Sequence, residues 1–169
     1  MARMVDALLS ELDQEAKTTR RVLERVPGDK LDWRPHPKSM SLGQLAQHVA
    51  TIPGSIAKAL MMDTLEVTSD FQAPAAKSAA DLVPALDESI TTAKEVVGSF
   101  DDQKMMGIWK LSLNGKEAFV APRIAVLRAI MLNHWYHHRG QLSVYLRLLD
   151  IPVPSIYGPS ADENPFAKA

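Results

Sequence analysis

Apolar residues recur at intervals of three and four positions through most of the chain, with charged residues between them. This spacing predicts helices that bury one face. A first helix is expected over residues 2–26, and Pro27-Gly28 ends it. Thr19 lies on its apolar face, where we expect a core threonine bonded back to its own backbone rather than a site residue. The apolar face comprises Val5, Leu8, Leu9, Leu12, Ala16, Val22, Leu23 and Val26.

Two further helices are expected in the middle of the chain. Ser41 and Gln44 match a capping box, so the second helix should begin at Ser41. Pro53-Gly54 interrupts its apolar pattern and predicts a kink or a break. Residues 64–77 resemble a linker, and the third helix is expected from about Asp81 to Gly98. The two apolar faces comprise Leu45, Val49, Ile52, Ile56 and Leu60, then Leu82, Leu86, Ile90, Ala93 and Val97.

The pattern changes between residues 108 and 119, where apolar and polar residues alternate around Asn114-Gly115. This predicts a hairpin that could cover one mouth of a helix bundle. Pro122 then begins a fourth helix that extends to about residue 150, and a proline-rich tail follows over 151–169. We expect the tail to pack along the bundle or on a partner subunit, at least through Tyr157. The sequence therefore predicts one all-α domain over residues 1–169, a four-helix bundle with a hairpin-like insertion before the last helix.

Three of the five histidines fall within residues 133–141 of the fourth helix. His134 and His138 are four residues apart, so their imidazoles lie on the same helix face. His137 falls on the flank of that face and is not expected to be a ligand. The predicted inward stripe comprises Leu127, Met131, His134, His138, Gln141, Tyr145 and Leu148.

Two interpretations of this pair remain open at this point. One is a set of core or interfacial histidines with satisfied nitrogens, and the other is metal ligation. His48 borders the apolar face of the second helix and would complete a three-His site with an open coordination position. His36 lies between two prolines and is expected to be a surface or loop-packing residue.

The amino-acid composition limits the kinds of ligand and partner that the chain could use. The chain has 169 residues, 46% of them apolar, a net charge of −1 and no cysteine. Disulfides and thiolate ligands are excluded, so a metal would need histidine, carboxylate or water, a donor set that suits zinc, nickel, iron or manganese. No basic surplus points to nucleic acid. Neither a signal-peptide core after Met1 nor an apolar run of membrane-spanning length is present, so the simplest expectation is a cytoplasmic protein.

Several segments carry a family resemblance. The most specific combination is His-x-x-x-His-Arg-Gly-Gln from His134 to Gln141 together with His48 on the second helix. The matching pieces are Trp33–Pro35, Ser41–Ala50, Asn133–Leu142, Tyr145–Arg147 and Pro152–Glu163. Through them the chain resembles the DinB-like (DNA-damage-inducible) bundle proteins, a superfamily that includes YfiT-type metal-dependent hydrolases and thiol-dependent S-transferases.

The resemblance implies an up-down-down-up bundle, a divalent metal held by His48, His134 and His138, and frequent homodimers. Zinc or nickel is expected ahead of iron or manganese. The substrate would be a small molecule, with the thiol of a transferase supplied by a low-molecular-weight cosubstrate. The family name does not imply DNA binding, and the charge of this chain argues against it.

Three functional hypotheses follow: a metal-dependent enzyme, a binding or sensing protein with a structural metal, or an interaction bundle in a stress response. No convincing general base stands out in the sequence. Gln141 could hydrogen-bond a ligand histidine, and Arg139 is expected in a structural ion pair. The acidic helix residues, expected to face solvent, are Glu11, Glu15, Glu88 and Glu95.

Association is suggested by apolar residues outside the predicted stripe of the fourth helix. These are Val126, Ile130, Val144 and Leu146. One core cannot bury every side of a helix, so a homodimer through the first or fourth helix is expected. The alternative is a monomer whose hairpin and tail cover the same residues.

Overall fold

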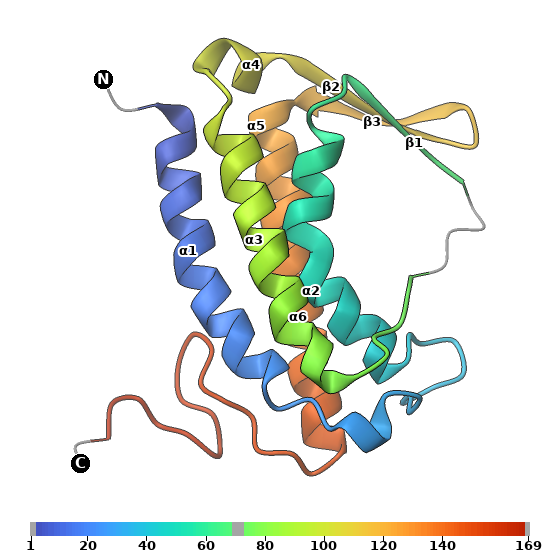
Figure 1. Ribbon diagram of the computed structural model, residues 1–169, viewed down its shortest axis with the longest axis vertical. Helices are drawn as coiled ribbons and strands as arrows, with labels where there is room; N and C mark the ends of the chain where they lie inside the picture. Colours follow the sequence, from blue (N-terminus) through green and yellow to red (C-terminus); the bar gives the residue numbers. More distant parts are fainter. Residues whose placement is uncertain (1–2, 69–72, 168–169) are drawn as a thin grey trace.

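The computed structural model describes residues 3–68 and 73–167, and within them four long helical segments lie side by side (Figure 1). Three of them are α1 (Met4–Leu23), α2 (Leu42–Ala59) and α3 (Leu82–Gly98). The fourth combines α5 (Arg123–Val126), the π-helical segment η3 (Leu127–Asn133) and α6 (His134–Leu148). In Figure 1, α1 and α6 run in one direction while α2 and α3 run in the other, the order that the resemblance implies.

The short elements lie between these segments. They are the single turns η1 (Gly28–Lys30) and η2 (Ala79–Asp81), the helix α4 (Asp102–Met106), and the strands β1 (Thr64–Val67), β2 (Ile108–Leu113) and β3 (Lys116–Pro122). The expected helix start at residue 2, linker residues 69–72 and the tail end at 168–169 lie outside the described residues. None of the helices in the described ranges combines the length and the apolar character needed to cross a membrane.

The expected all-α fold is wrong in part, because the described strands form a three-stranded sheet in the order β1-β2-β3 at one end of the helices. The hairpin is confirmed: β2 and β3 pair antiparallel, and Asn114 and Gly115 have φ angles of 49° and 74°. Those positive angles are what a two-residue hairpin turn requires. β1 pairs parallel with β2 from within the predicted linker. Its four residues are too few for a periodic signal, and its partner is distant in the sequence.

Two side chains attach this sheet to the helices. The indole Nε1 of Trp109 donates to the Ala59 carbonyl at 3.1 Å, and the Arg123 Nε donates to the Leu60 carbonyl at 2.9 Å. Both side chains are fully buried. Because carbonyls at the end of a helix lack partners within the helix, these donors satisfy the end of α2 and fix the sheet to it.

The start of α2 agrees with the sequence, and of the two outcomes expected at Pro53, a kink or a break, the break does not occur. Ser41 Oγ accepts from the Gln44 N–H at 3.2 Å, and the Ser41 N–H donates to Gln44 Oε1 at 2.9 Å. α2 continues unbroken through Pro53. Proline has no N–H for the carbonyl four residues earlier, that of Val49. The Trp135 indole supplies the missing donor at 2.8 Å, so the helix can hold a proline without an unsatisfied carbonyl.

Gly54 permits the close approach of α2 and α3. Its N–H donates to Ser89 Oγ at 2.8 Å. A Cβ on Gly54 would lie 2.9 Å from both the Cα and the carbonyl oxygen of Ser89, closer than van der Waals contact allows. Pro53 therefore leaves the Val49 carbonyl free to bond with Trp135 of α6. Gly54 allows the backbones of α2 and α3 to lie close together.

The fourth helical segment shows a shift in its buried face. Leu127 and Met131 are buried as predicted. Hydrogen bonds in η3 follow the wider π pattern, in which a turn takes one extra residue. The buried face of α6 consequently moves one position along, to Trp135, Arg139, Leu142 and Leu146. The predicted stripe is wrong beyond Met131: the histidines at 134 and 138 are only half-buried, and Leu148 is exposed.

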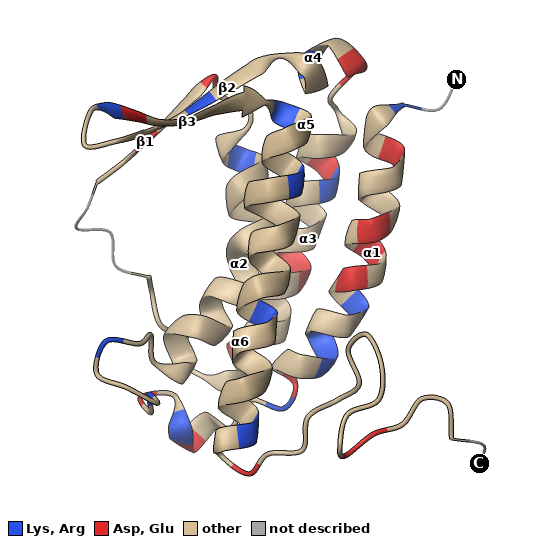
Figure 2. Cartoon of the chain, turned by 180° about the vertical axis from the view of Figure 1, so that it is seen from behind, with Lys and Arg blue, Asp and Glu red and all other residues tan. Residues whose placement is uncertain are grey.

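Along α1 the acidic residues precede the basic ones (Figure 2), and one acidic residue there is buried. Glu15 pairs with Arg139 at 2.6 Å, and Thr19 Oγ1 accepts from Arg139 Nη1 at 3.1 Å. The ion pair expected for Arg139 is thus confirmed. The expectation that Glu15 faces solvent is wrong, because its side chain is buried. Arg139 compensates the charge of that buried carboxylate. Thr19 is a core residue as expected, although its hydroxyl accepts from Arg139 rather than bonding to its own backbone.

The proline-rich tail packs on its own bundle. The Tyr157 hydroxyl donates to Glu15 Oε2 at 3.0 Å and also contacts Arg139. Further along, Glu163 pairs with Arg21 and Asp162 with Arg147. This arrangement confirms the expectation of packing through Tyr157 and closes the tail over α1 and α6.

Candidate metal centre

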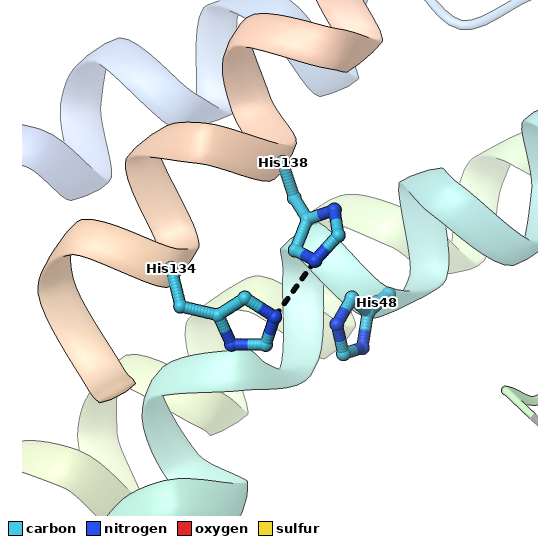
Figure 3. Close-up of side chains that lie close together, drawn as sticks. All are labelled: His48, His134 and His138. Atoms are coloured by element: carbon cyan, nitrogen blue, oxygen red, sulfur yellow. Dashed lines mark hydrogen bonds between the residues drawn. The ribbon is translucent and has the colours of Figure 1, made fainter. Parts of the chain in front are cut away.

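Three histidines meet between α2 and α6 (Figure 3). His48 extends from α2, whereas His134 and His138 extend from successive turns of α6. One ring nitrogen of each lies within 4.8 Å of those of the other two. The ring centroids of His48 are 5.2 Å from His134 and 4.7 Å from His138. The structure therefore brings together the three residues singled out from the sequence.

The hydrogen bond at Val49 positions this cluster. His48 precedes Val49 in α2, and His134 precedes Trp135 in α6. The indole-to-carbonyl bond of 2.8 Å between Val49 and Trp135 thus joins the two helices one residue away from a cluster histidine on each side. η3 ends at Asn133, directly before His134. The sequence predicted neither the Trp135–Val49 hydrogen bond nor the π-helical segment. Pro53 indicated a disturbance of the helix but not the hydrogen bond that replaces its missing N–H. No residue type indicates a π-helical segment.

The proton positions follow from the contacts of His138. Its Nδ1 lies 2.7 Å from Gln141 Oε1, an acceptor, so Nδ1 carries the proton. The lone pair is then on Nε2, which lies 2.7 Å from His134 Nε2. Gln141 is thereby confirmed as a hydrogen-bond partner of a cluster histidine. It holds His138 in the tautomer whose free nitrogen faces the other two rings.

Burial keeps the three imidazoles neutral. It lowers the pKa of His48 to about 4, with further lowering from His138 and His134. Burial likewise lowers the pKa of His134, although the Ile130 carbonyl opposes this in part. The pKa of His138 is lowered by burial and raised again in part by Gln141. Neutral imidazole is the form that binds a metal ion, and it is the form favoured here at neutral pH.

The cluster fits a divalent ion by its donors and its spacing. Bonds of about 2.0–2.1 Å in tetrahedral geometry place two ligand nitrogens about 3.3 Å apart. The separations here range from 2.7 Å between the two Nε2 atoms to no more than 4.8 Å, which brackets that value. The Nδ1 of His134 is buried without a hydrogen bond of normal geometry. These three residues could therefore hold a metal ion after small side-chain movements.

A cavity of about 420 Å³ opens beside the cluster, and His48 forms part of its wall. The remaining wall comes from the loop before α2, from the first turn of α2, and from the segment that begins at residue 73. Its lining residues are Arg34, Pro37, Lys38, Ser39, Met40, Gln44, His48 and Ala73. A small molecule in this cavity would reach the cluster from the side of His48.

The other two histidines lie outside the cluster, as expected. His137 is exposed, with its ring centroid 5.0 Å from that of His138. His36 lies in the exposed loop, where its Nδ1 accepts from the Lys38 N–H at 3.1 Å. Glu88 and Glu95 are exposed as expected. Glu11 is not free, because it pairs with Arg128 at 2.6 Å and accepts from the Tyr136 hydroxyl at 2.8 Å.

Comparison with known proteins places the chain in a family. The profile of the DinB family matches residues 1–165. The chain belongs to the DinB family. A curated relative is the uncharacterized protein YrdA of Bacillus subtilis, 26% identical over 166 residues that cover 96% of this chain and 93% of YrdA. The resemblance drawn from the sequence motifs is thereby confirmed.

Solved DinB-like structures have the same fold. A DinB-like protein from Bacillus cereus superposes with a TM-score of 0.69 at 23% identity, covering 93% of this chain and all of that one. A DinB-like protein from Bacillus subtilis, YjoA, superposes with a TM-score of 0.66 at 18% identity, covering 94% and all of the respective chains. At these identities the likeness concerns the fold, so the function has to be argued from the site of this DinB protein.

Proposed function

We propose that this DinB protein is a divalent-metal-dependent enzyme, of the hydrolase or the thiol-dependent S-transferase type. His48, His134 and His138 would hold the ion, zinc or nickel ahead of iron or manganese. The observation that carries the proposal is the convergence of three imidazoles from two helices, with nitrogens within 4.8 Å, one of which, that of His48, lines an open cavity. Three protein ligands with an open fourth position are typical of catalytic rather than structural zinc sites.

An ion held by three neutral ligands would keep its full charge and would lower the pKa of a bound water or thiol. The residues of the chain prepare the site for this. Burial keeps His48 neutral, and Gln141 holds the proton of His138 on Nδ1, away from the other rings. None of the described residues that line the cavity carries a carboxylate. That composition supports chemistry in which the nucleophile is activated at the metal rather than by an acidic residue.

Metal content tests the ligand set. The protein should be purified without a His tag, stripped with a chelator, reloaded and measured by elemental analysis. We expect about one ion per chain in the wild type, and a loss of most of it in His48→Ala, His134→Ala and His138→Ala. His137→Ala and His36→Ala are the matched controls and should keep the ion. A stripped wild type that cannot be reloaded would contradict the proposal.

Activity tests the reaction class. The stripped and reloaded proteins should be compared on activated esters, and on the transfer of a low-molecular-weight thiol to an electrophile. Turnover that appears only after reloading and is lost in His48→Ala would support an enzyme. Thiol consumption would assign the S-transferase type, and ester cleavage without thiol the hydrolase type. A loaded protein without turnover on a broad panel would instead favour a non-catalytic metal-binding bundle.

A further inference from the structure

The cavity beside His48 has a one-sided charge. Among the described residues of its wall, the charged ones apart from the histidine are Arg34 and Lys38, and both are positive. They belong to the loop that leads into α2, where Figure 2 shows positively charged residues. Both side chains are exposed. An anion entering the cavity would therefore meet two cations before it reached the histidine cluster.

No carboxylate in the described part of the chain pairs with these two cations. Within residues 3–68 and 73–167, Arg34 and Lys38 take part in none of the ion pairs. Cations elsewhere on the helices, such as Arg20 and Lys94, do have carboxylate partners. Gln44, the other long polar residue of the wall, is already engaged: it donates to the Ala73 carbonyl at 3.2 Å and accepts from the Ser41 N–H. Arg34 and Lys38 thus remain available to a ligand.

The opposite end of the cavity would also attract negative charge. A divalent ion on neutral imidazoles keeps a charge of +2, because no carboxylate belongs to the ligand group among the described residues. A molecule without a negative group at its far end would gain only from coordination to the ion, whereas an organic anion would gain at both ends.

We propose that the substrate is a small organic acid whose carboxylate binds Arg34 and Lys38 while its other end reaches the ion at His48, His134 and His138. This proposal rests on the proposed metal site, and it extends the proposed function by naming the substrate class. Arg34 and Lys38 are then specificity-determining residues. Arginine suits this role, since its planar guanidinium can bind both oxygens of a carboxylate.

The test compares two probes that differ only in the carboxylate, 4-mercaptobutyrate and 4-mercapto-1-butanol. Protein loaded with Co²⁺ is titrated with each, and binding is followed by the thiolate-to-cobalt absorption band. We expect the wild type to bind the carboxylate probe about tenfold more tightly, a preference that corresponds to two partly exposed charge pairs. The preference should shrink as salt is raised, because the cations are exposed.

Variants separate the cavity cations from the overall charge. Arg34→Gln/Lys38→Gln should lose the preference and still bind the alcohol as tightly as the wild type. Lys17→Gln/Arg25→Gln removes the same charge from exposed positions that do not line the cavity, and it should keep the preference. Equal binding of the two probes by the wild type, or an unchanged preference in Arg34→Gln/Lys38→Gln, would overturn the proposal.

Failure of the metal site would be visible separately, as absence of the cobalt absorption bands before any probe is added. The carboxylate proposal is then tested on the metal-free protein, by following the backbone amide signals of residues 34–44 in NMR titrations with the same two probes. Shifts there with the carboxylate alone, absent in Arg34→Gln/Lys38→Gln, would support the anion site. Identical responses to both probes would overturn it.

Discussion

At the scale of single residues, the cluster is set by the partners of each imidazole nitrogen. Gln141 is exposed, yet its amide oxygen lies 2.7 Å from His138 Nδ1. Replacing it with leucine removes the acceptor that fixes the tautomer. We expect Gln141→Leu to weaken Co²⁺ or Zn²⁺ binding by about 10–100-fold with little change in stability. Gln141→Glu keeps an acceptor and should retain the affinity. Equal metal affinity in the leucine variant and the wild type would show that the contact does not orient His138.

The pKa of His48 predicts how the stability of the metal-free protein depends on pH. In the folded protein the pKa is about 4, below its ordinary value of 6.5. Below pH 6.5 the unfolded chain therefore binds more protons than the folded one. The free energy of unfolding should be unaffected by His48 above pH 6.5 and fall progressively toward pH 4, by about 2–3 kcal/mol.

Chemical denaturation of stripped protein at several pH values measures this slope. His48→Asn should reduce it between pH 6.5 and 4, while His36→Asn in the exposed loop should leave it as in the wild type. If His48→Asn and the wild type lose stability in parallel, the burial of His48 does not govern its protonation.

At the scale of elements, one hydrogen bond determines how α2 and α6 meet. Trp135→Phe would leave the Val49 carbonyl buried without a donor, because Pro53 cannot supply one. We expect a loss of about 1–3 kcal/mol in the free energy of unfolding and weaker metal binding, because this bond lies one residue from His48 and His134. Trp109→Phe is the matched control, since it removes a similar indole-to-carbonyl bond at the sheet end of the bundle. It should lower stability alone. Metal affinity that falls equally in both variants would argue against a specific positioning role for Trp135.

The same scale shows where sequence periodicity succeeds and where it fails. Ser41 and Gly98 mark ends of α2 and α3 correctly, because capping and termination depend on local residues. The inward stripe of the fourth helix was correct at Leu127 and Met131 and shifted beyond them, since η3 adds a residue that the 3.6-residue period does not include. His134 and His138 were still identified, because their mutual spacing is independent of which face the helix buries.

At the scale of the whole molecule, the prediction of the fold was limited by contacts between residues that are far apart in the sequence. The turn at Asn114-Gly115 identified the β2-β3 hairpin from local residues. β1 joins the sheet through pairing with residues more than forty positions away, such as Thr64 with Lys110, so nothing near it indicated a strand. Glu15 was assigned to solvent for the same reason, because its partners Arg139 and Tyr157 come from distant segments.

The association surface also changes once the tertiary structure is known. Of the residues first suggested for a homodimer, Val126 and Leu146 are fully buried by the chain itself. Val144, also among them, is exposed to 56%, and Leu148 on the last turn of α6 is exposed to 57%. They are four residues apart and so share one helix face. We propose that this face pairs with its equivalent in a second copy about a two-fold axis.

Light scattering coupled to size-exclusion chromatography tests this pairing at micromolar concentration. We expect a mass of twice the 18.6 kDa of one chain. Val144→Lys/Leu148→Lys should give the single-chain mass, because two buried charges of the same sign from each copy would face each other across the axis. Leu113→Lys changes a similarly exposed apolar residue on the hairpin and should leave the dimer intact. A single-chain mass for the wild type that does not rise with concentration would refute the dimer.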